Sequence, residues 1–182
     1  MLVEMSLPAF VSPEEDKPAP MPLLRVQSLI NTLDIDKRTD ELAELDSART
    51  WLSSADLIRP GEALDEQDLA RVREFREGLR ALVGGRVDEL DGLRRLTSGR
   101  PVNIEVDAGG RVQLSTSDGL LGLLLTVRDA QADGSWSRLK LCANPDCGWA
   151  FYDRSRNQQG AWCSMAECGN RLKNRRFRAR GG

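Results

Sequence analysis

All four cysteines of the chain lie within one stretch, residues 142–171, which reads CANPDCGWAFYDRSRNQQGAWCSMAECGNR. They form two pairs, each with four intervening residues, and fifteen residues separate the two pairs. Two close pairs joined by a loop supply the four sulfur ligands of a tetrahedral Zn²⁺ site. The spacing therefore predicts one structural zinc ion bound by four thiolates, those of Cys142, Cys147, Cys163 and Cys168.

Other interpretations of the same cysteines have less support. Structural disulfides are disfavoured in an intracellular chain, and a thioredoxin-like redox pair has two intervening residues rather than four. A catalytic zinc ion needs an open coordination position, which four cysteine ligands do not leave. The chain has no histidine, so Ser–His and Cys–His catalysis are excluded. We therefore expect no enzymatic activity.

Short strands are predicted beside the first cysteine pair. Leu139 and Leu141 alternate with basic residues, and the aromatic run at 149–152 can pack against the metal centre. A module of about 40 residues buries too little apolar surface to fold alone, so the metal would supply much of its stability.

The charge of the chain changes sign near residue 140. Residues 1–139 carry 17 basic and 25 acidic side chains, whereas residues 140–182 carry nine basic and three acidic ones. An acidic body with a basic tail predicts a polyanionic partner for the tail. Duplex DNA is favoured over RNA, because the tail contains one aromatic residue, Phe177, for stacking on bases.

The tail reads GNRLKNRRFRARGG from residue 169 and predicts a basic helix whose direction the zinc site sets. We expect Gly169 to permit a tight turn at the metal ligand and Asn170 to cap the helix. The predicted phosphate contacts come from the helix and from the loop before it: Arg171, Lys173, Arg175, Arg176, Arg178, Arg180, Arg154 and Arg156. Two alternatives stay open. The protein binds RNA, or the tail is a solubilising or protein-docking element whose cations offset the zinc–thiolate charge.

Residues 23–134 predict a mainly helical domain with one β-hairpin. Helical periodicity marks residues 23–33, 46–55, 66–83, 86–97 and an apolar central helix at 119–130. Asp46 or Ser47, Asp65 and Asp118 are the expected N-caps. The period changes to two at 102–106 and 112–114, around a Gly-rich turn. The predicted fold class is thus α+β, mainly α, followed by a four-cysteine module that ends in a basic helix, residues 135–182.

The first 22 residues hold five of the eight prolines and several acids, a composition that predicts a disordered leader. The leader lacks the basic start of a secretory signal, and no apolar segment is long enough to span a membrane. We therefore expect a cytoplasmic protein with no membrane partner. The sequence leaves open whether it forms a homodimer or binds a small-molecule effector.

The run CSMAECGNR at 163–171, preceded by Trp162 and followed by the basic helix, resembles the bacterial CGNR zinc-finger family. The first cysteine pair, with Phe151, Asp153 and Ser155 after it, fits the same pattern. In that family the finger follows a helical domain called ABATE, and residues 29–33 (LINTL) look like its early Asn-Thr motif. The family usually has basic residues before the Trp-Cys pair, whereas this chain has QGA at 159–161.

This resemblance covers residues 23–180. It implies a stress-induced transcription regulator whose finger binds DNA and whose helical domain senses a signal or mediates dimerisation.

Overall fold

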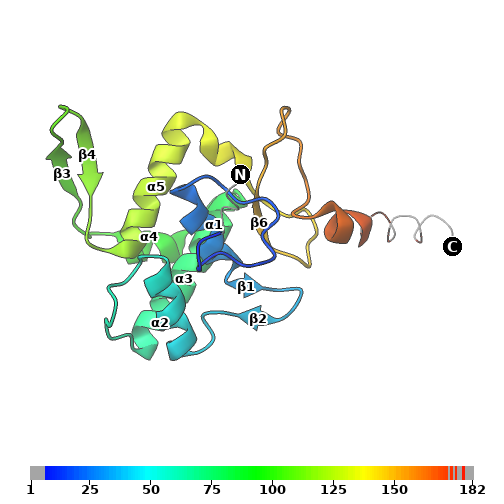
Figure 1. The fold of residues 1–182 in the computed structure, drawn as a ribbon, viewed down its shortest axis with the longest axis horizontal. Helices are drawn as coiled ribbons and strands as arrows, with labels where there is room; N and C mark the ends of the chain where they lie inside the picture. The colour runs from blue at the N-terminus through cyan, green and yellow to red at the C-terminus, as the bar shows by residue number, and fades with distance from the viewer. Residues whose placement is uncertain (1–6, 172, 174, 176–177, 179–182) are drawn as a thin grey trace, which may run out of the picture.

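The computed structural model of the chain describes residues 7–171, Lys173, Arg175 and Arg178. Within them the fold is α+β and mainly helical, as predicted (Figure 1). The α-helices are α1 (Leu23–Asn31), α2 (Leu45–Ser54), α3 (Glu66–Val83), α4 (Asp91–Thr97) and α5 (Gly119–Asp133). The strands form three antiparallel pairs: β1 (Leu33–Asp34) with β2 (Thr39–Asp40), β3 (Asn103–Val106) with β4 (Val112–Ser115), and β5 (Leu139–Leu141) with β6 (Ala150–Tyr152).

The helix ends follow local side-chain chemistry. Asp65 forms a capping box with Asp68 at the start of α3, and Asp118 accepts hydrogen bonds from the first backbone N–H groups of α5. The expected cap of α2 is wrong, because the helix begins at Leu45 without a side-chain cap. The helix expected at 86–97 is divided at Leu90 into a 3-10 turn (Val87–Glu89) and α4.

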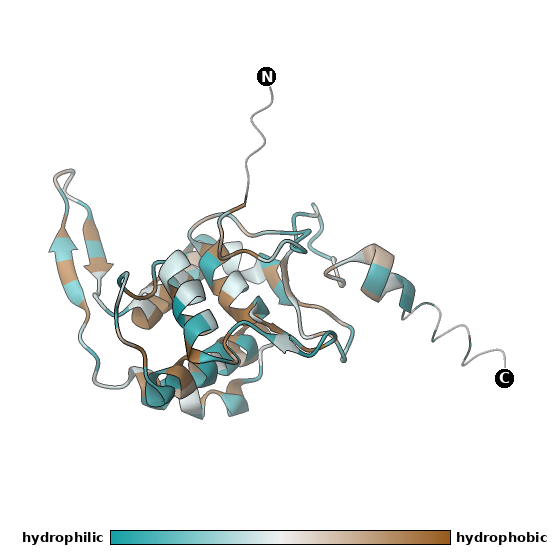
Figure 2. Cartoon of the chain, turned by 60° about the horizontal axis from the view of Figure 1, so that its bottom comes forward, coloured by the Kyte–Doolittle hydropathy of each residue, from teal (hydrophilic) through white to brown (hydrophobic). Residues whose placement is uncertain are grey.

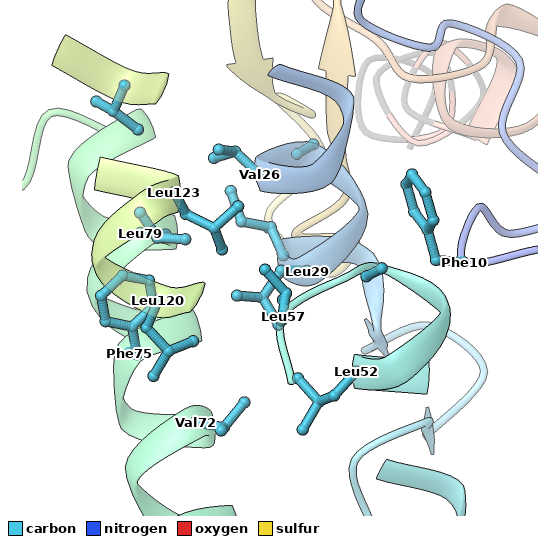
Figure 3. Close-up of a cluster of buried hydrophobic side chains, with 14 of the residues drawn as sticks. Phe10, Val26, Leu29, Leu52, Leu57, Val72, Phe75, Leu79, Leu120 and Leu123 are labelled. Carbon is cyan, nitrogen blue, oxygen red and sulfur yellow. The ribbon is translucent and has the colours of Figure 1, made fainter. Parts of the chain in front are cut away.

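The core lies between α1, α3 and α5, with α2 closing one end (Figure 3). Leu29 of α1, Phe75 and Leu79 of α3 and Leu123 of α5 are almost completely buried there. Strands β5 and β6 extend the same core, since Leu139, Ala150 and Tyr152 belong to the same buried cluster. The four-cysteine module is therefore packed against the helical domain rather than tethered to it.

The expectation of a disordered leader is wrong for residues 7–22. Phe10 is buried with its ring edge-to-face against Trp51, whose indole N–H donates to the Phe10 carbonyl over 3.0 Å. Further along, the Ala19 N–H donates to the side chain of Gln27 over 2.6 Å. A few apolar anchors and satisfied backbone groups outweigh the proline-rich composition here. Residues 1–6 lie outside the described part of the chain.

Among the described helices, none is long and apolar enough to cross a membrane. The β3–β4 hairpin and the C-terminal helix leave the body on opposite sides (Figure 1).

Candidate metal centre

The four cysteine sulfurs converge at one point. They all lie within 4.8 Å of one another. The Cys147–Cys163 and Cys163–Cys168 sulfur pairs are each 3.7 Å apart. A tetrahedral zinc ion with Zn–S bonds of about 2.3 Å requires sulfurs about 3.8 Å apart. The four residues therefore match the donor type, number and spacing of a structural zinc site.

A tight knuckle holds the first pair. The Cys142 N–H donates to the Trp149 carbonyl over 2.8 Å, and the Cys147 N–H donates to the Asn144 carbonyl over 3.0 Å. Gly148 has a φ of 65°, a left-handed conformation that favours glycine. The buried side-chain amide of Asn144 lies 3.6 Å from the Cys168 sulfur and donates to it. The Asn-Pro-Asp turn thus orients a ligand of the second pair as well as the first.

Of the second pair, Cys163 precedes one wide helical turn, Met165–Gly169, and Cys168 lies within it; the turn continues into the basic helix. Gly169 does not have a positive φ. A Cβ there would lie 2.8 Å from the sulfur of Met165, an exposed and flexible side chain that could move aside. Asn170 is not the expected N-cap: its backbone is already helical, and its side chain donates to the Ala166 carbonyl over 3.1 Å.

The close approach of the sulfurs separates their pKa values. Hydrogen bonds from Cys147 and Cys163 lower the pKa of the Cys142 thiol to about 2. The bond to Cys142, together with burial, raises the pKa of Cys147 to about 12 and also raises that of Cys163. The first thiolate therefore suppresses ionisation of its neighbours, and a divalent cation removes that penalty.

Polar side chains of the helical domain hold the knuckle in place. Asn31, at the end of α1, donates to the Ala150 carbonyl over 2.8 Å and accepts from the Ala150 N–H over 2.7 Å. Arg80 of α3 donates to the Gly148 carbonyl over 2.8 Å and to the Ile30 carbonyl over 2.7 Å. Three of these bonds hold the segment that follows Cys147, and the fourth ties Arg80 to α1.

The ordered leader joins the same network. The buried carboxylate of Glu15 accepts from the Asn31 amide over 2.9 Å and from the Trp149 indole N–H over 3.1 Å. Burial raises the pKa of Glu15, although these hydrogen bonds oppose the shift. Lys17 donates from its ammonium to the Trp162 carbonyl over 2.5 Å. Leader, α1 and cysteine module thus share one buried polar junction.

A second buried carboxylate closes the loop between the cysteine pairs. Asp153 accepts from Lys140 over 2.8 Å, from the Ser155 N–H over 3.0 Å and from the Gly160 N–H over 2.7 Å. Burial opposes its ionisation, but these three donors together hold its pKa well below the ordinary range. The loop therefore has a defined shape despite its Gly-containing QGA segment.

The predicted phosphate contacts fall into three groups. Lys173, Arg178 and Arg156 are exposed. Arg171 and Arg175 pair with acids of this chain, Asp36 at 2.6 Å and Asp146 at 2.8 Å. The Arg154 guanidinium donates to the Pro18 carbonyl over 2.8 Å and lies over the Tyr152 ring. Arg176 and Arg180 lie outside the described residues.

Residue reasoning by itself missed Glu15, Gln27 and Arg80 as parts of this site. Gln27 donates to the Ala150 carbonyl over 3.2 Å from a completely buried position on α1. Gln27 could have been found from the sequence, because a polar residue on the apolar stripe of a predicted helix needs a buried hydrogen-bond partner. Asn31, within the LINTL motif, is a second such residue. Arg80 had no such signal, because its partners in the site are the carbonyls of Gly148 and Ile30 and its ion pair with Glu77 on the same helix is an ordinary one.

A helical domain fused to a four-cysteine zinc finger defines the class of this protein. Residues 138–181 match the CGNR zinc finger family. Residues 25–134 match the ABATE family, described as "Putative stress-induced transcription regulator", and the chain belongs to that family. Neither description names an enzymatic activity. A search of curated proteins found no match.

Proposed function

We propose that this protein is a zinc-dependent, DNA-binding transcription regulator of the cytoplasm. In this proposal the four cysteines hold one structural Zn²⁺, and the helix after Cys168 presents cations to the DNA backbone. The observation that carries the proposal is the direct connection between the two features. Cys168 is buried to 2% exposure, and Arg171, three residues later, is exposed to solvent.

This connection matters because phosphate contacts are stronger when the cations are held in place. The junction at Asn31 and Arg80 fixes the knuckle, and the metal would fix the wide turn at Met165–Gly169 to it. The start of the basic helix would then have little freedom to lose on binding. Helical geometry spaces Arg171, Arg175 and Arg178 along one stripe.

The acids of the body restrict how DNA can approach. In the free chain, Arg171 forms an ion pair with Asp36, and Arg175 forms one with Asp146. The Arg175–Asp146 pair is largely exposed and the Arg171–Asp36 pair partly so, and exchanging such a carboxylate for a phosphate costs little free energy. The negative body repels DNA elsewhere, which favours a contact made through the tail alone.

The test is fluorescence anisotropy with a labelled pool of duplex DNA and the zinc-loaded full chain. We expect Arg171→Ala, Arg175→Ala and Arg178→Ala, combined, to weaken binding at least tenfold. A control with Arg94, Arg95 and Arg128 changed to alanine removes the same charge from exposed positions on α4 and α5. Equal affinity of the two triple variants would overturn the proposed DNA contact.

Salt and competitor experiments separate this proposal from its alternatives. Each neutralised phosphate lowers the slope of log affinity against log salt by about 0.9, so contacts from Arg171, Arg175 and Arg178 predict a slope of about −2.7. Binding that is lost to competitor RNA at matched salt, and retained against duplex DNA, would identify an RNA-binding protein instead. A flat salt dependence would identify a protein-docking tail. Chelation should abolish DNA binding, and added zinc should restore it.

A further inference from the structure

The β3–β4 hairpin projects from the body as an arm (Figure 1), and hydrophobic and hydrophilic residues alternate along its strands (Figure 2). The register pairs Ile104 with Leu114 and Val106 with Val112 on one face. The other face carries the polar pairs, Asn103 with Ser115 and Glu105 with Gln113. Antiparallel sheets with this alternation normally cover the apolar face and leave the polar face in water.

In the single chain most of the apolar face is uncovered, although Leu114 is half-buried. Ile104 is 74% exposed, Val112 71%, Val106 68% and the adjacent Val102 40%. No other cluster of exposed large apolar side chains of this size occurs among the described residues, where the rest are scattered. A two-stranded hairpin with no covering layer is only marginally stable. The alternating pattern of the arm therefore suits it to pack against a second apolar surface, which the single chain does not provide among its described residues.

Side chains near the polar face form hydrogen bonds with one another. The Ser115 hydroxyl donates to Glu105 over 2.5 Å, and the Gln113 amide donates to Asp107 over 2.6 Å. The turn is closed by Asp107, which accepts from the backbone N–H groups of Gly109 and Arg111. These bonds hold the arm in shape and leave its apolar face as the surface for a partner.

We propose that this face packs against the same face of a second copy of the chain, so that the hairpin is a dimerisation arm. The face carries no charged side chain, which disfavours nucleic acid as its partner. Two flat faces of β-branched side chains stack at about 10 Å, as the two sheets of a β-sandwich do. The low net charge of −2 opposes self-association only weakly.

The area sets the expected strength of the dimer. A fully exposed Val or Ile side chain offers roughly 100 Å² of apolar surface, so at their observed exposures these four side chains offer roughly 250 Å² per copy. Two copies would therefore bury roughly 500 Å² from these side chains, the size of a weak contact. We accordingly expect a weak dimer that is populated only toward the upper end of a concentration series reaching about 300 μM.

The arm and the basic helix lie on opposite sides of the body, so arm-to-arm packing leaves both basic helices free (Figure 1). The inference is thus independent of the proposed DNA binding, and neither requires the other.

The experiment is sedimentation velocity of the zinc-loaded full chain from about 1 to 300 μM, without DNA. Val106→Lys combined with Val112→Glu replaces a cross-strand apolar pair by an opposite-charge pair, which preserves the hairpin and removes the apolar face. The matched control makes the same kinds of change at exposed apolar positions away from the arm, Val87→Lys with Met21→Glu. Circular dichroism and zinc content verify that each variant folds.

We expect the wild type and the control to dimerise alike and the charged variant to associate at least tenfold more weakly. A wild type that stays monomeric at 300 μM would overturn the proposal, because the face is then free or serves a different partner. Dimerisation of the charged variant at wild-type strength would also overturn it, because the interface then lies elsewhere.

Discussion

Replacing Asn31 by alanine should loosen the zinc finger at its junction with the helical domain. Asn31 is 7% exposed and makes three hydrogen bonds, two with the backbone of Ala150 and one with the carboxylate of Glu15. The Ala150 carbonyl would keep the bond from Gln27, but the Ala150 N–H would lose the bond it makes to the Asn31 oxygen. The Glu15 carboxylate would retain its donors from Lys17 and Trp149.

The magnitude follows from these losses. One buried N–H without its acceptor costs about 1–3 kcal/mol, and a weakened buried carboxylate costs about 1 kcal/mol more. We therefore expect Asn31→Ala to lower the free energy of unfolding by about 3 kcal/mol. For a chain of this length, that corresponds to a decrease in Tm of about 6–12 °C.

Two measurements test this. The first is the Tm of the zinc-saturated protein, and the second is the rate at which a coloured chelator captures its zinc. Asn157→Ala is the matched control, because Asn157 is exposed and its amide bonds only to the neighbouring Gln159 side chain. We expect the control to change Tm by about 1–2 °C at most, and only the Asn31 variant to release zinc faster. A Tm for Asn31→Ala within about 2 °C of the wild type would refute the proposed role of this junction.

Three further predictions test the charges and the metal. Asp36→Ala should free Arg171 and raise DNA affinity up to about threefold at low salt. The control Asp88→Ala, at an exposed acid away from the tail, should leave the affinity unchanged. Equal anisotropy curves for the two variants would contradict the prediction. Removing zinc with a chelator should unfold the cysteine module, at a loss on the order of 10 kcal/mol, seen in tryptophan fluorescence from Trp149 and Trp162; an unchanged spectrum would argue against a structural metal. Burial raises the pKa of Glu15, so the folded chain binds this proton more tightly than the unfolded chain, and stability falls as pH rises through the folded-state pKa. Glu15→Gln should flatten that decline, which begins at the ordinary glutamate pKa of 4.5 and continues above it, in chemical unfolding at saturating zinc. An equally steep decline in both proteins would assign it to other groups.

Local signals in the sequence predicted most of the helical domain. Capping by Asp65 and Asp118 and the change of period at the hairpin are properties of neighbouring residues, which is why α3, α5 and β3–β4 appear where expected. The convergence of the four cysteines also follows from spacing, because two close pairs must meet to share one ion.

The parts that sequence reasoning missed depend on partners that are distant along the chain. The leader is ordered because Phe10 meets Trp51 and Glu15 meets Asn31 and Trp149, and proline content carries no information about such contacts. Arg80 was overlooked for a similar reason, since a backbone carbonyl can accept a bond whatever its side chain is. The pairing of Arg171 with Asp36 requires the β1–β2 turn to lie beside the zinc finger, and no local sequence pattern predicts that arrangement.

The junction also explains why metal and helical domain should act together on the basic helix. Zinc can fix the sulfurs relative to one another, but it cannot fix the finger relative to the body. That second task falls to directional hydrogen bonds from α1 and α3 to the backbone at Gly148 and Ala150, within three residues of the ligand Cys147. A shift of α1 would therefore move the knuckle with it, because a bond of 2.7–2.8 Å tolerates little displacement. The direction in which the chain continues after Cys168 should accordingly depend on α1 and α3 as well as on the metal.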